Sequence, residues 1–115
     1  MNYLIEMKLA DSARPKSPQD GVTFIEGFVL PSLEILDQLQ KEGRLLAGGP
    51  VAGAIELALI VRAESVQELD ELVESLPVWV LMETRVVPLQ TLSGRATAVQ
   101  HKLESFRAIV ASMKS

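Results

Sequence analysis

Alternating apolar and polar residues predict several β-strands along the chain. The first covers residues 1–9, and its apolar face consists of Tyr3, Ile5, Met7 and Leu9. A short strand over residues 44–47 is expected to end where Gly48-Gly49-Pro50 breaks it. Further strands cover residues 54–63 and 81–92. Pro88 in the last of them indicates a sheet edge or a bulge, because proline cannot donate a hydrogen bond to a neighbouring strand.

Apolar residues spaced three and four positions apart predict a long helix over residues 18–42. Its apolar stripe consists of Val22, Ile25, Val29, Leu33, Leu36 and Leu39. Ser17 followed by Pro18 is typical of a helix start. Pro31 lies inside the helix and removes the hydrogen bond to the carbonyl of Gly27, so we expect a kink or a break near these residues.

Two more helices follow. One begins with Ser65-Val66-Gln67-Glu68, a capping-box sequence, and ends at Pro77. The other covers residues 93–114, with an apolar seam formed by Ala96, Val99, Leu103, Phe106, Val110 and Met113. This seam is heptad-like but short, so it fits either a helix packed on its own domain or a helix that joins subunits.

The order of these elements predicts an α+β fold, a ferredoxin-like βαββαβ unit with an extra C-terminal helix. We expect one domain over residues 1–115, in which residues 93–115 form a helical extension. The strand over residues 54–63 is apolar on both faces, so both faces of the sheet need a cover. The extra helix or a second copy of the sheet can supply it, and we favour a dimeric α+β barrel.

Composition excludes several classes of chemistry. The 115 residues contain no cysteine and a single histidine, His101, so we expect no thiol nucleophile and no multi-histidine or cysteine metal site. The net charge of −4 and the lack of a basic block argue against nucleic acid as a partner. We expect neither a signal peptide nor a membrane span, and hence a cytoplasmic protein.

Charged residues within predicted strands are the candidates for chemistry. Glu83, Glu56 and Glu6 can carry a proton if they face a cleft. Arg44 and Arg85 can bind an anionic substrate. The structural alternative is that these residues form ion pairs at the rim, and alternation places Glu83 and Arg85 on one face, within reach of a neighbouring strand. Trp79 either lines a substrate pocket or packs at the corner between helix and strand, and His101 is expected at a surface or interface.

Residues Leu76 to Val86 (LPVWVLMETRV) resemble the muconolactone isomerase family, which has a similar Ser-Leu-Pro, apolar residues and then Met-Glu. The likeness extends through Gln38–Arg44 and Gly53–Leu69 and covers residues 1–92. It implies ferredoxin-like units assembled as dimeric barrels into larger oligomers. It also implies cofactor-free isomerisation, by proton transfer, of a lactone of aromatic catabolism. The run Glu42–Pro50 is similar to the YCII-related group as well.

The chain also departs from that family. Between Gly43 and Gly53 the family has a polar, aromatic segment with basic residues and a histidine, whereas here only Arg44 is basic. An apolar residue near Leu57 replaces a polar one, and Glu83 is the acidic position that matches. The histidine typical of the YCII-related group is also missing from the first half of this chain.

Two functions follow from these observations. The first is an isomerase that needs no cofactor or metal, in which Glu83 or Glu56 carries the proton. Arg44 or Arg85 holds the carboxylate of a small substrate, and Trp79 lines its pocket. The second is a non-catalytic small-molecule-binding or oligomeric interaction protein on the same scaffold. Both imply a homodimer or a larger homo-oligomer.

Overall fold

The sheet is built around one central strand. In the computed structural model, which describes residues 1–114, β1 (Asn2–Leu9) pairs antiparallel with β3 (Glu56–Arg62) and with β4 (Met82–Leu89). β2 (Leu45–Pro50) pairs antiparallel with β3, so the strand order is β2-β3-β1-β4. The predicted ferredoxin-like arrangement is confirmed, and Pro88 lies at a sheet edge in β4, as expected.

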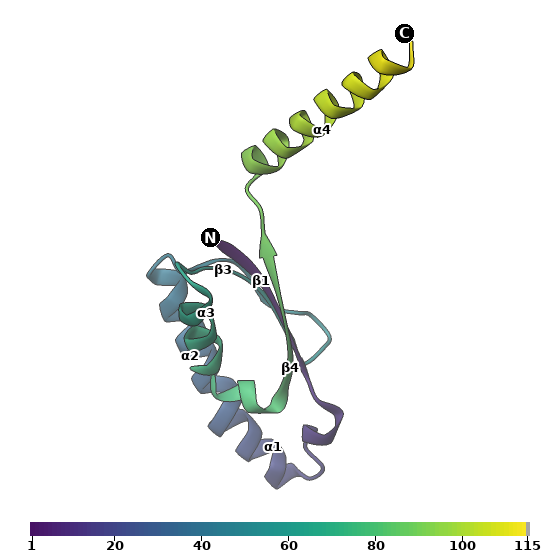
Figure 1. Cartoon of the computed structure of the whole chain (residues 1–115). Helices are drawn as coiled ribbons and strands as arrows, with labels where there is room; N and C mark the ends of the chain where they lie inside the picture. Colours follow the sequence, from purple (N-terminus) through teal and green to yellow (C-terminus); the bar gives the residue numbers. More distant parts are fainter. Residues whose placement is uncertain (115) are drawn as a thin grey trace.

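Helices cover one face of this sheet (Figure 1). A long helical segment comprises α1 (Pro18–Phe24), η2 (Ile25–Val29) and α2 (Leu30–Lys41), and α3 (Val66–Glu74) contributes to the same core. The short helix η1 (Asp11–Ala13) follows β1, and η3 (Pro77–Leu81) leads into β4. The core between sheet and helices includes Tyr3, Ile5, Met7, Leu36, Leu39, Leu57, Leu59, Val61, Leu69, Leu72, Val73 and Leu76. The stripe predicted for the long helix is therefore only partly buried, because Val22 and Ile25 are about half exposed.

Both predicted helix starts are confirmed. The Ser17 hydroxyl accepts a hydrogen bond from the Asp20 N–H, and the Ser65 hydroxyl accepts one from the Glu68 N–H, each at 3.1 Å. The second cap differs from a standard capping box. Its Glu68 carboxylate accepts from the N–H of Glu64 at 2.8 Å rather than from that of Ser65.

The irregularity expected near Pro31 is a wide helical turn. Ile25–Val29 form a π-helical segment, in which the Leu30 N–H donates to the carbonyl of Ile25, five residues earlier. The buried hydroxyl of Ser32 then donates to the Phe28 carbonyl at 2.7 Å and accepts from the Val78 N–H at 3.1 Å. This hydroxyl thereby connects the helix to η3 by hydrogen bonds. The helix itself continues without a break.

The predicted break at Gly48-Gly49-Pro50 is wrong, because these residues lie inside β2 and pair with β3. The glycines allow a close approach of the two strands. Gly48 has a φ of +98°, and a Cβ atom there would collide with the Ala58 carbonyl oxygen. A register shift between Leu45 and Ala47 accompanies this irregular backbone.

The last helix, α4 (Leu92–Met113), extends away from the rest of the chain (Figure 1). It has no buried residue, so the structure does not show a helix packed on its own domain. The radius of gyration is 20.4 Å, whereas a compact chain of this length has about 13 Å. Within residues 1–114, no helix is long and apolar enough to cross a membrane.

We expect Gly48→Ala to lower the free energy of unfolding by at least about 2 kcal/mol, because the new methyl group meets backbone and the φ angle is strained. Urea denaturation followed by circular dichroism measures this change. Gly21→Ala is the matched control. It lies in α1 with open space around it, and we expect it to stabilise the protein by about 0.5–1 kcal/mol. Equal effects of the two substitutions would contradict the close approach at Gly48.

Candidate functional site

The face of the sheet opposite the helices carries two rows of charged side chains. Lys8 on the central strand is opposite Glu56 on one side and Glu83 on the other. In the next row, Glu6 is opposite Ala58 and Arg85. Alternation puts these residues on the open face, because their neighbours on β1 point into the core.

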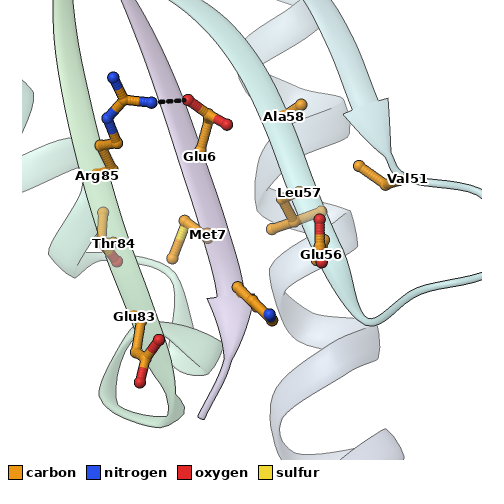
Figure 2. Close-up of a pocket in the computed structure, with 10 residues that line it drawn as sticks. Glu6, Met7, Val51, Glu56, Leu57, Ala58, Glu83, Thr84 and Arg85 are labelled. Atoms are coloured by element: carbon orange, nitrogen blue, oxygen red, sulfur yellow. Dashed lines mark hydrogen bonds and ion pairs between the residues drawn. The ribbon is translucent and has the colours of Figure 1, made fainter.

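These rows surround a hollow of about 300 Å³ (Figure 2). Its lining comes from β1, β3, β4 and the residue that follows β2, and comprises Glu6, Met7, Lys8, Val51, Glu56, Leu57, Ala58, Glu83, Thr84 and Arg85. The structure thus brings together three of the predicted site residues, Glu56, Glu83 and Arg85, from two strands that are not neighbours. Glu6, the third carboxylate considered from the sequence, lies between them.

Arg85 and Glu6 form an ion pair across β1 and β4, with 3.0 Å between Nη1 and Oε1 (Figure 2). A salt bridge to a neighbouring strand was the structural alternative for this arginine, and it is what the structure has. Arg85 is nevertheless 73% exposed. Its guanidinium group therefore retains donors that can bind an anion.

Lys8, Glu56 and Glu83 take part in none of the ion pairs found within residues 1–114. Adjacent strands are about 4.8 Å apart, so the two carboxylates lie on strands separated by roughly 10 Å. A small molecule over Lys8 can thus meet a carboxylate on either side and a cation beneath it.

Arg44 and Trp79 lie outside this hollow. Arg44 precedes β2, and its Nη2 atom is 3.3 Å from Oε1 of Glu68 on α3. Its carbonyl accepts a hydrogen bond from Arg62, at the opposite end of β3 from Glu56. Trp79 is half-buried in η3 and packs against the core, and it also lines a separate hollow with Val80, Met82 and Thr84.

Lys8 was not among the predicted site residues, although alternation places it on the same face as Glu6. Its position between two carboxylates depends on strand register, which the sequence alone does not show. His101 is exposed on α4, as expected. In the described part of the chain, no group of three or more acidic or histidine side chains is arranged to hold a metal ion.

Comparison with known proteins agrees with this architecture. The family model described as muconolactone delta-isomerase matches residues 1–93. A crystal structure of muconolactone isomerase has a TM-score of 0.63 at 20% sequence identity, covering 79% of this chain and 90% of that chain. At this identity the likeness concerns the fold. No curated protein sequence matches the chain.

A second similar structure is a 5-chloro-2-hydroxyhydroquinone dehydrochlorinase from Burkholderia phenoliruptrix AC1100, solved in complex with 2,5-dihydroxybenzoquinone. It has a TM-score of 0.57 at 25% identity and covers 82% of this chain and 98% of that chain. The family match ends at residue 93, so nearly all of α4 lies beyond it.

We expect Arg85→Gln to lower the free energy of unfolding by less than about 1 kcal/mol, because exposed ion pairs contribute little to stability. Arg44→Gln is the comparison variant and should destabilise the protein more, since it leaves Glu68 without its cation in a half-buried position. Thermal and urea denaturation of both variants measure the difference. A large loss of stability in Arg85→Gln would mean that this ion pair serves the fold rather than a ligand.

Proposed function

The chain belongs to the muconolactone delta-isomerase family, and we propose that it is a cofactor-free isomerase that moves a proton within a small anionic lactone of aromatic catabolism. The observation that carries this proposal is the row formed by Glu56, Lys8 and Glu83, with Arg85 beside it. Such a row combines groups that can move a proton with groups that can bind an anion. A hollow of about 300 Å³ is of the size that small ligands occupy.

In the proposed reaction, the carboxylate of Glu83 removes a proton from a ring carbon of the lactone. The electrons of the broken C–H bond move into the conjugated system, and negative charge develops on the carbonyl oxygen. The ammonium group of Lys8 stabilises that charge. Protonated Glu83 then returns the proton to a different ring carbon, so the substrate is isomerised and the carboxylate is restored.

Arg85 binds the carboxylate of the substrate in this proposal, and Glu56 is the alternative proton carrier. Glu83 is favoured because it is the acidic residue that matches the family. The dehydrochlorinase supports the class of ligand, since it was solved with a small oxygen-substituted ring on a similar fold. The substrate also competes with Glu6 for Arg85, because the two already form an ion pair.

We further propose that a second copy of the chain covers the open face of the sheet and closes the hollow. Beside the charged rows this face carries Leu4, Ile60 and Val87, which form one row across β3, β1 and β4 and are half-buried. An apolar row on a sheet face without helices is favourably buried against another sheet. The active unit is then a dimeric barrel.

A second candidate is a non-catalytic protein that binds small molecules on the same scaffold. The pairing of Arg85 with Glu6 favours it, because this pairing offsets part of the positive charge that an anionic substrate needs. It predicts ligand binding without turnover, so measurements of both separate the two functions.

We expect Glu83→Gln to lower kcat on a responsive lactone by about 10²–10⁴-fold, with little effect on ligand binding, because the amide retains the shape but cannot take up the proton. Turnover on a panel of unsaturated lactone carboxylates and calorimetric binding test this. Glu74→Gln on α3 is the matched control and should keep full activity. If Glu83→Gln leaves turnover unchanged and Glu56→Gln abolishes turnover, Glu56 is the residue that transfers the proton. Binding without turnover in the unmodified protein supports the second candidate.

For the barrel, we expect the unmodified protein to have at least twice the chain mass in light scattering. Ile60→Glu should lower the measured mass by at least half, because the substitution places a charge in the apolar row of the covered face. Val66→Glu, an exposed position on α3, is the control and should leave the mass unchanged. A strict monomer for the unmodified protein would contradict the barrel.

A further inference from the structure

The helix α4 presents an apolar seam to solvent along its whole length. Two heptad positions alternate along this seam and hold Ala96, Leu103 and Val110 at one and Val99, Phe106 and Met113 at the other. The larger side chains are 40–79% exposed. An exposed apolar stripe of this kind is typical of an interaction surface.

The charges beside the seam argue against pairing of α4 with itself. Arg95 and Lys102 occupy one flanking position of the heptads, and Arg107 and Lys114 occupy the other. The acidic residue of the helix, Glu104, lies outside both flanks. In a pair of α4 helices the flanking positions would face one another, so like charges would repel.

The rest of the chain has the opposite charge. Residues 92–114 contain four basic residues and one acidic residue, which leaves seven basic and fourteen acidic residues in residues 1–91. The helical segment 18–42 alone carries five acidic residues and one basic residue. A basic apolar helix is therefore complementary to an acidic apolar surface elsewhere on the same kind of chain.

One such surface lies along α1, η2 and α2 on the side of β2, and we name it the α2–β2 groove. It consists of two adjoining hollows of about 290 and 180 Å³, which share Leu33 and Pro50. Its lining includes Phe24, Ile25, Val29, Leu33, Leu36, Asp37, Pro50, Ala54, Ile55 and Glu56. Ile25 and Ile55 are 50% and 40% exposed, and Asp37, whose carboxylate pairs with Lys41 at 2.9 Å, lines the second hollow.

The lengths of the two surfaces agree. The groove follows the long helical segment from Phe24 to Gln40, about 24 Å at the rise of an α-helix. The seam runs from Ala96 to Met113, about 26 Å on the same basis.

The short connection before α4 prevents it from lying lengthwise in the groove of its own chain. Only Gln90 and Thr91 separate β4 from α4, and the three Cα steps from Leu89 to Leu92 span at most about 11 Å. β4 and β2 are the opposite edges of the sheet, three strand spacings or roughly 14 Å apart. In Figure 1, α4 accordingly points away from α1 and α2.

We propose that the seam of α4 docks in the α2–β2 groove of a second copy of this chain. The apolar side chains of the seam fill the two hollows, and the basic flanks of α4 face the acidic helical segment 18–42, which includes Asp37. The groove lies on the helix side of the sheet, so this contact leaves the open face and its hollow free. It therefore links chains independently of the proposed active site and of the barrel, and extends a dimer to a larger assembly.

Disulfide cross-linking between two variant chains tests the docking directly, because the native chain has no cysteine. A mixture of Leu33→Cys and Phe106→Cys chains should form a mixed disulfide dimer under mild oxidation, at least about tenfold faster than a mixture of Leu33→Cys and Ala108→Cys chains. Ala108 is the control because it lies on the face of α4 opposite the seam. Mass spectrometry identifies which chains are joined.

Light scattering of the full-length protein gives a second readout. Leu103→Glu should lower the mass of the assembly, as should a rise in salt from 50 to 500 mM, whereas Ala108→Glu should not. Three results would overturn the proposal: equal cross-linking by Phe106→Cys and Ala108→Cys, faster pairing of Phe106→Cys with itself than with Leu33→Cys, or an unchanged mass for Leu103→Glu. Binding of α4 to anionic phospholipid vesicles without a change in mass would point instead to a membrane surface.

Discussion

The register of β1 is the constraint on which both the core and the candidate site depend. Because strand residues alternate between the two faces, the burial of Ile5 and Met7 under the helices forces Glu6 and Lys8 onto the open face. A shift of one residue would bury both charges and expose the core residues, so the register is strongly fixed. Because β1 pairs with β3 on one side and with β4 on the other, its register also places Glu56 and Glu83 on either side of Lys8.

Much of this fold could be predicted from local patterns. The alternation in β1, the caps at Ser17 and Ser65, and the edge position of Pro88 each depend on residues close in sequence, and each is confirmed. The break predicted at Gly48-Gly49-Pro50 was wrong for a non-local reason. Glycine can end a strand or let another backbone approach, and only the pairing with β3 decides between these.

In the candidate site, too, local patterns predict some features, and strand pairing determines the others. Local alternation predicted that Glu83 and Arg85 share a face, and the structure brings both to one hollow together with Glu56. The place of Lys8 between two carboxylates needs the register of three strands, which no single segment contains. Arg44 was grouped with the site by residue type, but the cap of α3 brings Glu68 next to it at the other end of β3.

The helix α4 differs physically from α2 and α3, which bury apolar residues in the core. Most helices in proteins gain their stability from an apolar face packed on the fold, and isolated helices are only marginally stable in water. α4 has the Thr91 cap at its start, but none of its apolar side chains is buried. Contact with another surface would therefore stabilise the helix as well as the assembly, since one apolar seam serves both. In the proposed docking, a seam of fewer than three heptads suffices as an interface because the acidic segment 18–42 beside the groove supplies the complementary charge that a second α4 lacks.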